Sequence, residues 1–239
     1  MNKNEPCVER IFLYEGRRDV FFEVYRPASA SVRPAVLICP GGGYQVVGST
    51  EGRPVAERFL AQGYTAFVLR YSIGDGAVFG PGGFDDFDPV NDARRAMEIL
   101  RGRAAQFEID ADRIVLAGFS AGGHLASAYC FSGAGLDFLP AALLLTYPMS
   151  ERGDMPAAFN ITTMPFSQEP AVKSLPVFFH HAKDDKMVPF AGSVHLEERL
   201  TREGIEHVFL AYDHGVHAQP FANDEWFPKA IAWLKEKGV

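Results

Sequence analysis

Cysteine, long apolar runs and clustered positive charge are all scarce in this sequence. The 239 residues include three cysteines, Cys7, Cys39 and Cys130, and no Cys-x-x-Cys pair. We therefore expect free, packed thiols and neither a disulfide framework nor a zinc site. No apolar run approaches the ~18 residues of a membrane span, and the amino terminus lacks the apolar core of a signal peptide. These absences predict no membrane partner and a cytoplasmic location.

The charged residues argue against a second group of functions. Lys and Arg number 23 against 30 Asp and Glu, which gives a net charge of −7, and the basic residues are scattered along the chain. Proteins that bind nucleic acid gather basic residues on one surface, so we expect no nucleic-acid partner and a substrate that is not strongly anionic. No His-Glu-x-x-His or comparable ligand cluster occurs, so the sequence predicts no metal and no cofactor.

Apolar residues are plentiful, and their order predicts a fold. Hydrophobic residues make up 47% of the chain, and no linker divides residues 1–239, so we expect a single domain. Strands that alternate with helices after an initial hairpin predict an α/β fold with a mostly parallel central sheet and helices on both faces. The hairpin is expected at 8–14 and 20–25, further strands at 35–39, 64–71, 114–117, 142–147, 176–182 and 207–212, and helices at 51–61, 90–105, 190–202 and 224–237.

Two segments show no regular period. Residues 72–89 are rich in Gly, Asp and Phe, and a loop of this length is expected to be functional or mobile, as one wall of a pocket. Residues 149–175 are expected to pass over the strand ends and to form at most a small lid. Aromatic residues near these loops are expected to pack in the core rather than stack on a bound ligand: Tyr44, Phe79, Phe84, Phe87 and Phe166.

The strongest functional signal is a serine between two glycines. The run 118–122 reads Gly-Phe-Ser-Ala-Gly, and it lies between a predicted strand and a predicted helix. This is the Gly-x-Ser-x-Gly pattern of a nucleophile elbow, in which a strained turn presents the serine hydroxyl. A serine that only caps a helix after a glycine turn is the alternative. The strand before it, the helix after it and the doubled Gly122-Gly123 together favour the elbow, so Ser120 is the candidate nucleophile.

A serine nucleophile needs a histidine base and a carboxylate that orients the histidine, in the chain order Ser, acid, His. Asp184 and Asp185 follow one predicted strand, and His214 and His217 follow the next. Asp185 is favoured because it has the Asp-x-x-Val-Pro spacing at a loop crest, which leaves Asp184 to stabilise the loop. His217 is favoured because Gly215 allows a close approach, whereas His214 is expected in the wall of the turn.

Three other histidines are expected to be structural. His180 and His181 are consecutive in a predicted strand and so face opposite sides of the sheet. His124 lies four residues after Ser120, where a buried, hydrogen-bonded role is expected.

The negative charge of a tetrahedral intermediate needs N–H donors. A nucleophile elbow supplies the N–H of the next residue, here Ala121. The loop Pro40-Gly41-Gly42-Gly43 is the second source, since its glycines let N–H groups turn toward a ligand without interfering side chains. A merely flexible turn is the alternative.

Together these motifs resemble the α/β-hydrolase superfamily. Within it they look like small bacterial acetylesterases and acetyl-xylan-esterase-like proteins, which are neighbours of the hormone-sensitive-lipase group. The resemblance covers most of the chain and rests on residues 39–44, 51–56, 63–71, 118–125, 185–189 and 215–217.

This resemblance implies an α/β-hydrolase fold with at most a small cap and a serine carboxylesterase activity that forms an acyl-enzyme. The implied substrates are short-chain acyl esters, especially acetyl esters of sugars or xylo-oligosaccharides. The implied catalytic residues are Ser120, Asp185 and His217, and the implied oxyanion donors are Gly42, Gly43 and Ala121.

Two positions depart from the pattern of these families. Pro40 stands where hormone-sensitive-lipase relatives usually have His, and Ala218 stands where the subgroup commonly has Gly. A peptidase or acyltransferase on the same triad and a non-catalytic ligand-binding hydrolase fold are the alternative functions. The sequence leaves the oligomeric state open, a homodimer included.

Overall fold

A twisted sheet positions every loop discussed above. The computed structural model describes residues 9–27, 31–80, 83–153 and 155–239. In these residues the strand order is β1-β2-β4-β3-β5-β6-β7-β8; β1 and β4 each pair antiparallel with β2, and the other pairs are parallel. The strands are β1 (Glu9–Phe12), β2 (Phe21–Tyr25), β3 (Arg33–Cys39), β4 (Thr65–Arg70), β5 (Ile109–Phe119), β6 (Ala142–Thr146), β7 (Val177–Ala182) and β8 (His207–Tyr212).

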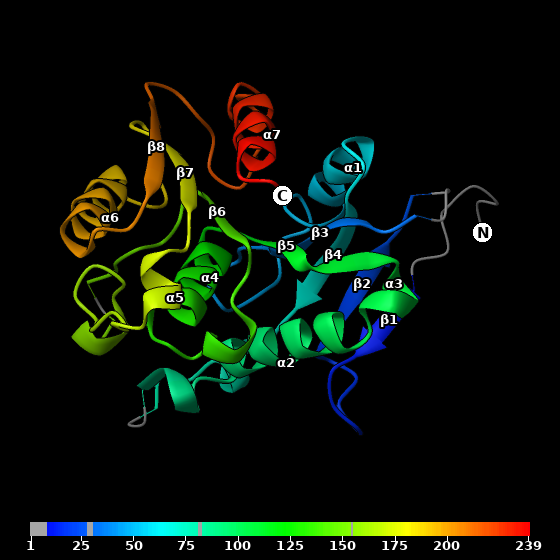
Figure 1. The fold of residues 1–239 in the computed structure, drawn as a ribbon. Coiled ribbons are helices and arrows are strands. Elements are labelled where there is room, and N and C mark those ends of the chain that lie inside the picture. Colours follow the sequence, from blue (N-terminus) through cyan, green and yellow to red (C-terminus); the bar gives the residue numbers. More distant parts are fainter. Residues whose placement is uncertain (1–8, 28–30, 81–82, 154) are drawn as a thin grey trace.

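Helices cover both faces of this sheet (Figure 1). On one face lie α1 (Arg53–Ala61) and α7 (Trp226–Glu236), and on the other lie α2 (Asp88–Gly102), α4 (Ala121–Phe131) and α6 (Phe190–Glu203). The predicted fold class, with its antiparallel N-terminal hairpin, is confirmed. Shorter pieces are the helices α3 (Ala104–Phe107) and α5 (Pro170–Lys173) and the 3₁₀ turns Gly74–Gly76, Gly83–Asp86, Leu136–Phe138 and Ala157–Phe159.

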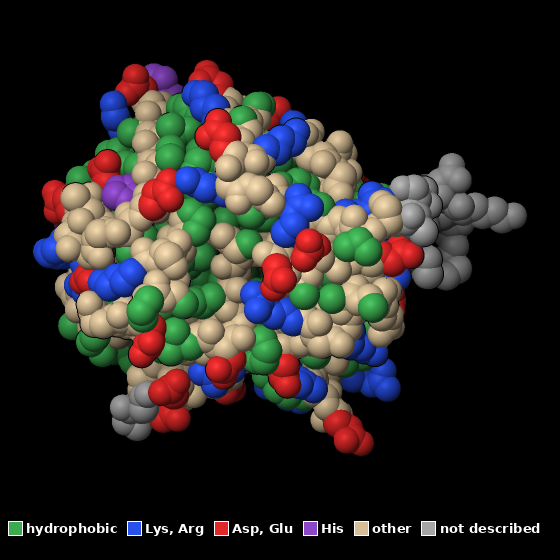
Figure 2. Space-filling view, in the orientation of Figure 1, with side chains coloured by type: hydrophobic (Ala, Val, Ile, Leu, Met, Phe, Trp, Pro, Cys, Tyr) green, Lys and Arg blue, Asp and Glu red, His purple; other side chains and the backbone are tan. Residues whose placement is uncertain are grey.

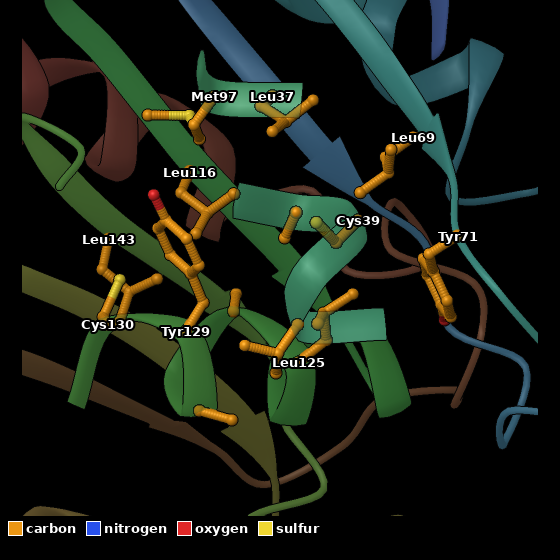
Figure 3. Packing of buried hydrophobic residues seen from close by; sticks show 14 of the residues in the cluster. Leu37, Cys39, Leu69, Tyr71, Met97, Leu116, Leu125, Tyr129, Cys130 and Leu143 are labelled. Carbon is orange, nitrogen blue, oxygen red and sulfur yellow. The ribbon is translucent and has the colours of Figure 1, made fainter. Parts of the chain in front are cut away.

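Neighbouring residues of the central strands enter two different cores. Leu37 and Leu116 pack with α2 and α4, whereas Val36 and Val115 pack with α1 and α7. Because both faces are covered, these strands are continuous apolar runs rather than alternating ones. Figure 3 shows part of the first core, with labels on Leu37, Cys39, Leu69, Tyr71, Met97, Leu116, Leu125, Tyr129, Cys130 and Leu143.

Some element bounds differ from the sequence-based expectation. Strand β5 begins at Ile109, five residues early, because Ile109 pairs with Arg33 across a register shift in β3. The helix expected at 90–105 is divided, since α2 ends at Gly102 and α3 begins at Ala104. Val8, the expected start of the hairpin, and Cys7 lie outside the described residues. Cys39 and Cys130 are free and buried.

The two aperiodic segments pack against the rest of the protein. Residues 149–175 contribute Phe159 and Phe166 to the core beside α4, and the Phe166 ring stacks on Phe131 at 4.6 Å. From the segment 72–89, Phe79 lies 4.6 Å from Phe159, so the two segments contact each other. Among the aromatic residues expected in the core, Tyr44, Phe84, Phe87 and Phe166 are buried and Phe79 is half-buried.

The first turn of α4 approaches the backbone of β3 through glycines. A Cβ at Gly122 would lie 2.0 Å from the carbonyl oxygen of Cys39 and 2.4 Å from that of Pro40. A Cβ at Gly118 would lie 2.5 Å from the carbonyl oxygen of Gly122. These glycines therefore let the strand–turn–helix unit close tightly. Every helix in the described ranges is too short or too polar to span a bilayer.

We predict that Gly122→Ala destabilises the protein, because the new methyl group would push α4 away from β3. The free energy of unfolding, measured by urea denaturation, should fall by at least about 1–3 kcal/mol. Gly102→Ala at the end of α2 is the matched control, since its Cβ would meet nothing within 4 Å. That control should leave the stability unchanged or raise it. Equal effects of the two substitutions would contradict the close approach.

Candidate active site

Ser120 occupies a strained turn between β5 and α4. Its backbone has φ 52° and ψ −120°, a combination that residues with a side chain rarely adopt. The Ser120 N–H donates to the carbonyl oxygen of Thr146 at 3.1 Å. The Ser120 carbonyl accepts from the N–H groups of Gly123, His124 and Met149 at 2.9, 3.1 and 3.0 Å. The neighbouring backbone thus holds the strained conformation and fixes the direction of the side chain.

Ser120, His217 and Asp185 form a continuous hydrogen-bonded chain. The distance from Ser120 Oγ to His217 Nε2 is 2.9 Å, and that from His217 Nδ1 to Asp185 Oδ2 is 2.7 Å. The side chains of His217 and Asp185 are only 6% and 2% exposed. An ionised carboxylate can only accept, so Nδ1 carries the ring hydrogen and Nε2 accepts from the serine hydroxyl. The structure therefore brings together the three residues that the sequence singled out.

Four hydrogen bonds converge on the Asp185 carboxylate. Besides His217, the donors are His181 Nε2 at 3.1 Å and the N–H groups of Met187 and Val188 at 2.8 and 3.0 Å. Burial alone would raise the pKa of Asp185, but these donors outweigh burial and hold that pKa well below its usual range. Asp185 is thus a buried carboxylate that stays ionised.

His181 belongs to this network, which the sequence analysis missed. It lies on β7. The ionised Asp185 carboxylate can only accept, so His181 Nε2 donates to it, and Nδ1 lies 2.8 Å from the hydroxyl of Ser193 on α6. Its neighbour His180 points to the other face, as predicted, and stacks on Trp226 with ring centroids 4.6 Å apart. Burial lowers the pKa of His180 to about 3. The sequence signal that could have identified His181 was its place near the end of a predicted strand, four residues before the candidate acid Asp185.

Asp184 and His214 form a separate pair outside this chain. The Asp184 carboxylate accepts from His214 Nδ1 and from the N–H of Gly215, both at 2.9 Å. The side chain of His214 is 90% exposed. Asp184 therefore connects the loop after β7 to the loop after β8, and no hydrogen bond joins either residue to Ser120.

The loop after β3 lies directly against Ser120. A Cβ at Gly41 would come 2.7 Å from Ser120 Cβ, and Gly42 and Gly43 have φ values of 127° and 62°. Within the described ranges, the N–H groups of Gly42, Gly43 and Ala121 have no hydrogen-bond acceptor in the protein. Ala121 is the first residue of α4, where an N–H has no partner within the helix. Gly41 differs, because its N–H donates to the Glu51 carboxylate at 2.6 Å.

His124 has the buried, hydrogen-bonded position that was expected. Its side chain is inaccessible to solvent, Nε2 donates to the carbonyl oxygen of Phe159 at 2.7 Å, and Nδ1 accepts from the Tyr44 hydroxyl at 2.7 Å. Burial lowers the pKa of His124 to about 4, so the ring is neutral near pH 7. His124 joins the loop after β3 to the segment 149–175.

The residue after His217 adopts a conformation that favours glycine. Ala218 has φ 59°, and its carbonyl oxygen accepts from Thr50 Oγ1 at 2.7 Å. This backbone requirement is a physical reason for the glycine that the resembling subgroup commonly has here. The contact also connects the His217 loop to the loop after β3.

The surface and the metal-ligand chemistry add two observations. On the face in view in Figure 2, Lys and Arg side chains are interspersed with Asp and Glu. In the part of the chain that the structure describes, no three His, Cys, Asp or Glu side chains are grouped so that they would hold a metal ion.

The fold and the geometry define an α/β protein with a Ser-His-Asp chain at the carboxyl edge of its sheet. A sequence profile described as alpha/beta hydrolase fold matches residues 88–217, more than half of the chain, and a profile described as BD-FAE matches residues 22–138. The chain therefore belongs to the alpha/beta hydrolase fold family.

Individual relatives agree with this family. The crystal structure of MGS-M1, an alpha/beta hydrolase enzyme from a Medee basin deep-sea metagenome library, has a TM-score of 0.80 and 30% identity, covering 96% of this chain and 97% of that one. Endo-1,4-beta-xylanase B of Butyrivibrio fibrisolvens is 29% identical over 82% of this chain and 34% of its own length. Acetylxylan esterase of Xylanibacter ruminicola is 28% identical over 90% of this chain and 46% of its own length. The chain thus spans between a third and a half of these two curated relatives.

We predict that the contribution of Asp185 to stability depends on pH. The pKa of Asp185 is lower in the folded protein than the usual value of about 3.9 expected when unfolded. The ionised group therefore stabilises the fold above about pH 5, and this contribution is lost as the pH falls. Asp185→Asn should lower the free energy of unfolding by about 1–3 kcal/mol at neutral pH. In urea denaturation, the difference from wild type should shrink toward about pH 3; a constant difference would contradict the prediction.

Proposed function

We propose that this protein is a serine carboxylesterase in which Ser120 is the nucleophile, His217 the general base and Asp185 the residue that orients the base. The observation that carries the proposal is the unbroken chain from Ser120 Oγ through both nitrogens of His217 to Asp185 Oδ2, with links of 2.9 and 2.7 Å. A serine in a strained turn, an imidazole hydrogen-bonded to it and a carboxylate that stays ionised are the parts that acyl transfer requires.

The reaction proceeds in two halves. Ser120 Oγ attacks the acyl carbon while its proton passes to His217 Nε2, and the imidazolium then gives that proton to the departing alcohol. A water molecule next loses a proton to His217 and attacks the acyl-enzyme; the proton returns to Ser120 Oγ as the acid leaves. Asp185 remains ionised throughout and stabilises the imidazolium, which agrees with the direction of its pKa shift.

The oxyanion of each tetrahedral intermediate is assigned to the N–H groups of Ala121, Gly42 and Gly43. The absence of protein acceptors for these groups in the described residues supports the assignment. One preorganised donor of this kind typically contributes ~2.7–4 kcal/mol to transition-state stabilisation.

For the substrate we propose short acyl esters, and acetyl esters of sugars or xylo-oligosaccharides in particular. The printed names of the two curated relatives, an acetylxylan esterase and an endo-1,4-beta-xylanase, support this class. We also propose that residues 1–239 form one domain. The support is that each apolar core combines residues from distant parts of the chain, as when Tyr25 and Trp233 share one cluster.

We predict that Ser120→Ala abolishes hydrolysis of p-nitrophenyl acetate, because the loss of a triad nucleophile typically lowers kcat by about a millionfold. Labelling by a fluorophosphonate probe should be lost as well. Ser174→Ala is the control, since Ser174 is exposed at the end of α5 and its hydroxyl donates to carbonyl oxygens of that short helix. A wild-type protein that folds but neither hydrolyses the ester nor takes the label would favour the non-catalytic alternative.

The same assay distinguishes Asp185, which belongs to the triad, from Asp184, which pairs with His214. Asp185→Asn should lower kcat by about 10⁴-fold, because the imidazole loses its orienting acceptor. Asp184→Asn should change kcat little, since Asp184 contacts only His214 and Gly215 in the network described above. The reverse order of effects would assign the acid to Asp184.

We predict a preference for acetyl over longer acyl groups. With p-nitrophenyl esters, kcat/KM should fall by about tenfold or more between acetyl and butyryl, the size of discrimination that a few methylene groups allow. Acetylated xylo-oligosaccharides should be deacetylated and should compete with p-nitrophenyl acetate. Faster cleavage of aminoacyl amides, or acyl transfer to added alcohols in place of hydrolysis, would instead identify a peptidase or an acyltransferase.

A further inference from the structure

Glu51 is a buried carboxylate beside the active site that the triad mechanism leaves without a role. It precedes α1 and is only 1% exposed. Its two oxygens accept short hydrogen bonds, Oε2 from the Gly41 N–H at 2.6 Å and Oε1 from the Tyr147 hydroxyl at 2.8 Å. A carboxylate is costly to bury, so a position this deep requires compensating donors. Both donors belong to active-site elements.

The first hydrogen bond fixes the loop that holds the assigned oxyanion donors. A Cβ at Gly41 would lie 2.8 Å from Glu51 Oε2, and a Cβ at Gly48 would lie 2.9 Å from it, so the loop is built closely around the carboxylate. The Gly48 N–H in turn donates to the Gly41 carbonyl oxygen at 2.8 Å. Glu51 accepts from the Gly41 N–H, whereas the next two N–H groups, those of Gly42 and Gly43, have no acceptor among the described residues and are open to a ligand.

The second hydrogen bond holds a wall of the histidine site. Tyr147 follows β6 with φ 36°, and its N–H donates to the His180 carbonyl oxygen at 2.8 Å. Its ring lies 4.6 Å from the His217 ring, with 48° between the planes. Burial raises the pKa of Glu51, while the Tyr147 hydroxyl, the Gly41 N–H and the nearby His217 oppose that rise.

We infer that Glu51 is a positioning residue. Its side chain holds the loop after β3, which carries the Gly42 and Gly43 N–H groups, and at the same time holds Tyr147, whose ring lies beside His217. The inference rests on the proposed serine esterase function. Glu51 does not contact the reacting atoms. It acts by fixing where the Gly42 and Gly43 N–H groups and the His217 ring lie when the tetrahedral intermediate forms.

The test compares Glu51→Ala and Glu51→Gln with Glu57→Gln, which removes an exposed carboxylate from α1. Hydrolysis of p-nitrophenyl acetate gives kcat and KM, and a trifluoromethyl ketone, which forms a tetrahedral adduct with the serine, reports on the oxyanion site. Urea denaturation checks that each variant is folded.

We predict that Glu51→Ala lowers kcat by about 100-fold, the loss typical of a misplacement of about 1 Å, while KM stays within a few-fold. The inhibition constant of the ketone should rise in parallel with the loss in kcat/KM. Glu51→Gln keeps an acceptor for the Gly41 N–H and a polar partner for Tyr147, so its kcat should recover at least tenfold over that of Glu51→Ala. Glu57→Gln should resemble wild type.

Two results would overturn the inference. One is a folded Glu51→Ala variant whose kcat and ketone affinity equal those of Glu57→Gln. The other is a Glu51→Ala variant whose KM rises by as large a factor as its kcat falls. If Glu51→Ala does not fold, Tyr147→Phe decides: it keeps the ring and removes one hydrogen bond, so kcat should fall about fivefold at unchanged KM, and no change would overturn the inference. An inactive, unlabelled wild-type protein is a different result, because it removes the proposed function itself.

Discussion

The strained turn at Ser120 is the constraint on which the site depends. A serine held at φ 52° needs its neighbours to enforce that conformation, and three backbone N–H groups do so by donating to its carbonyl oxygen. The enforcement works only because α4 starts almost in contact with β3, where Gly122 leaves no space for a side chain. Packing in the two apolar cores thus stabilises a local backbone conformation that the chain would otherwise avoid.

Sheet order then brings the remaining groups to the same edge. Gly41, Ser120, Tyr147, Asp185 and His217 follow β3, β5, β6, β7 and β8, which are consecutive neighbours in the sheet. The carboxyl ends of parallel strands share one edge, so five loops that are distant in sequence meet there. Each loop needs only a few residues to reach the serine.

Two buried carboxylates, those of Asp185 and Glu51, hold the loops at this edge in place. Asp185 accepts from two histidines and two backbone N–H groups, so it fixes the base on one side of the serine. Glu51 accepts from Gly41 and Tyr147, so it joins the loop after β3 to the tyrosine whose ring lies beside His217. Buried charge is tolerated here because each acceptor oxygen has a donor, and its directional hydrogen bonds restrain loops that apolar contacts alone would leave loose.

By itself the sequence determined the order of strands and helices, the turn at Ser120 and the strand ends that carry Asp185 and His217, because periodicity and glycine spacing are local signals. Only the tertiary structure decided that Asp184 pairs with His214, that His181 shares the Asp185 carboxylate, and that Phe159 and Phe166 pack beside α4. It alone revealed the contacts of Glu51, which lies 96 residues from Tyr147 in the chain. Such pairings depend on the direction in which each loop side chain points. That direction is set by packing between elements that are far apart in sequence.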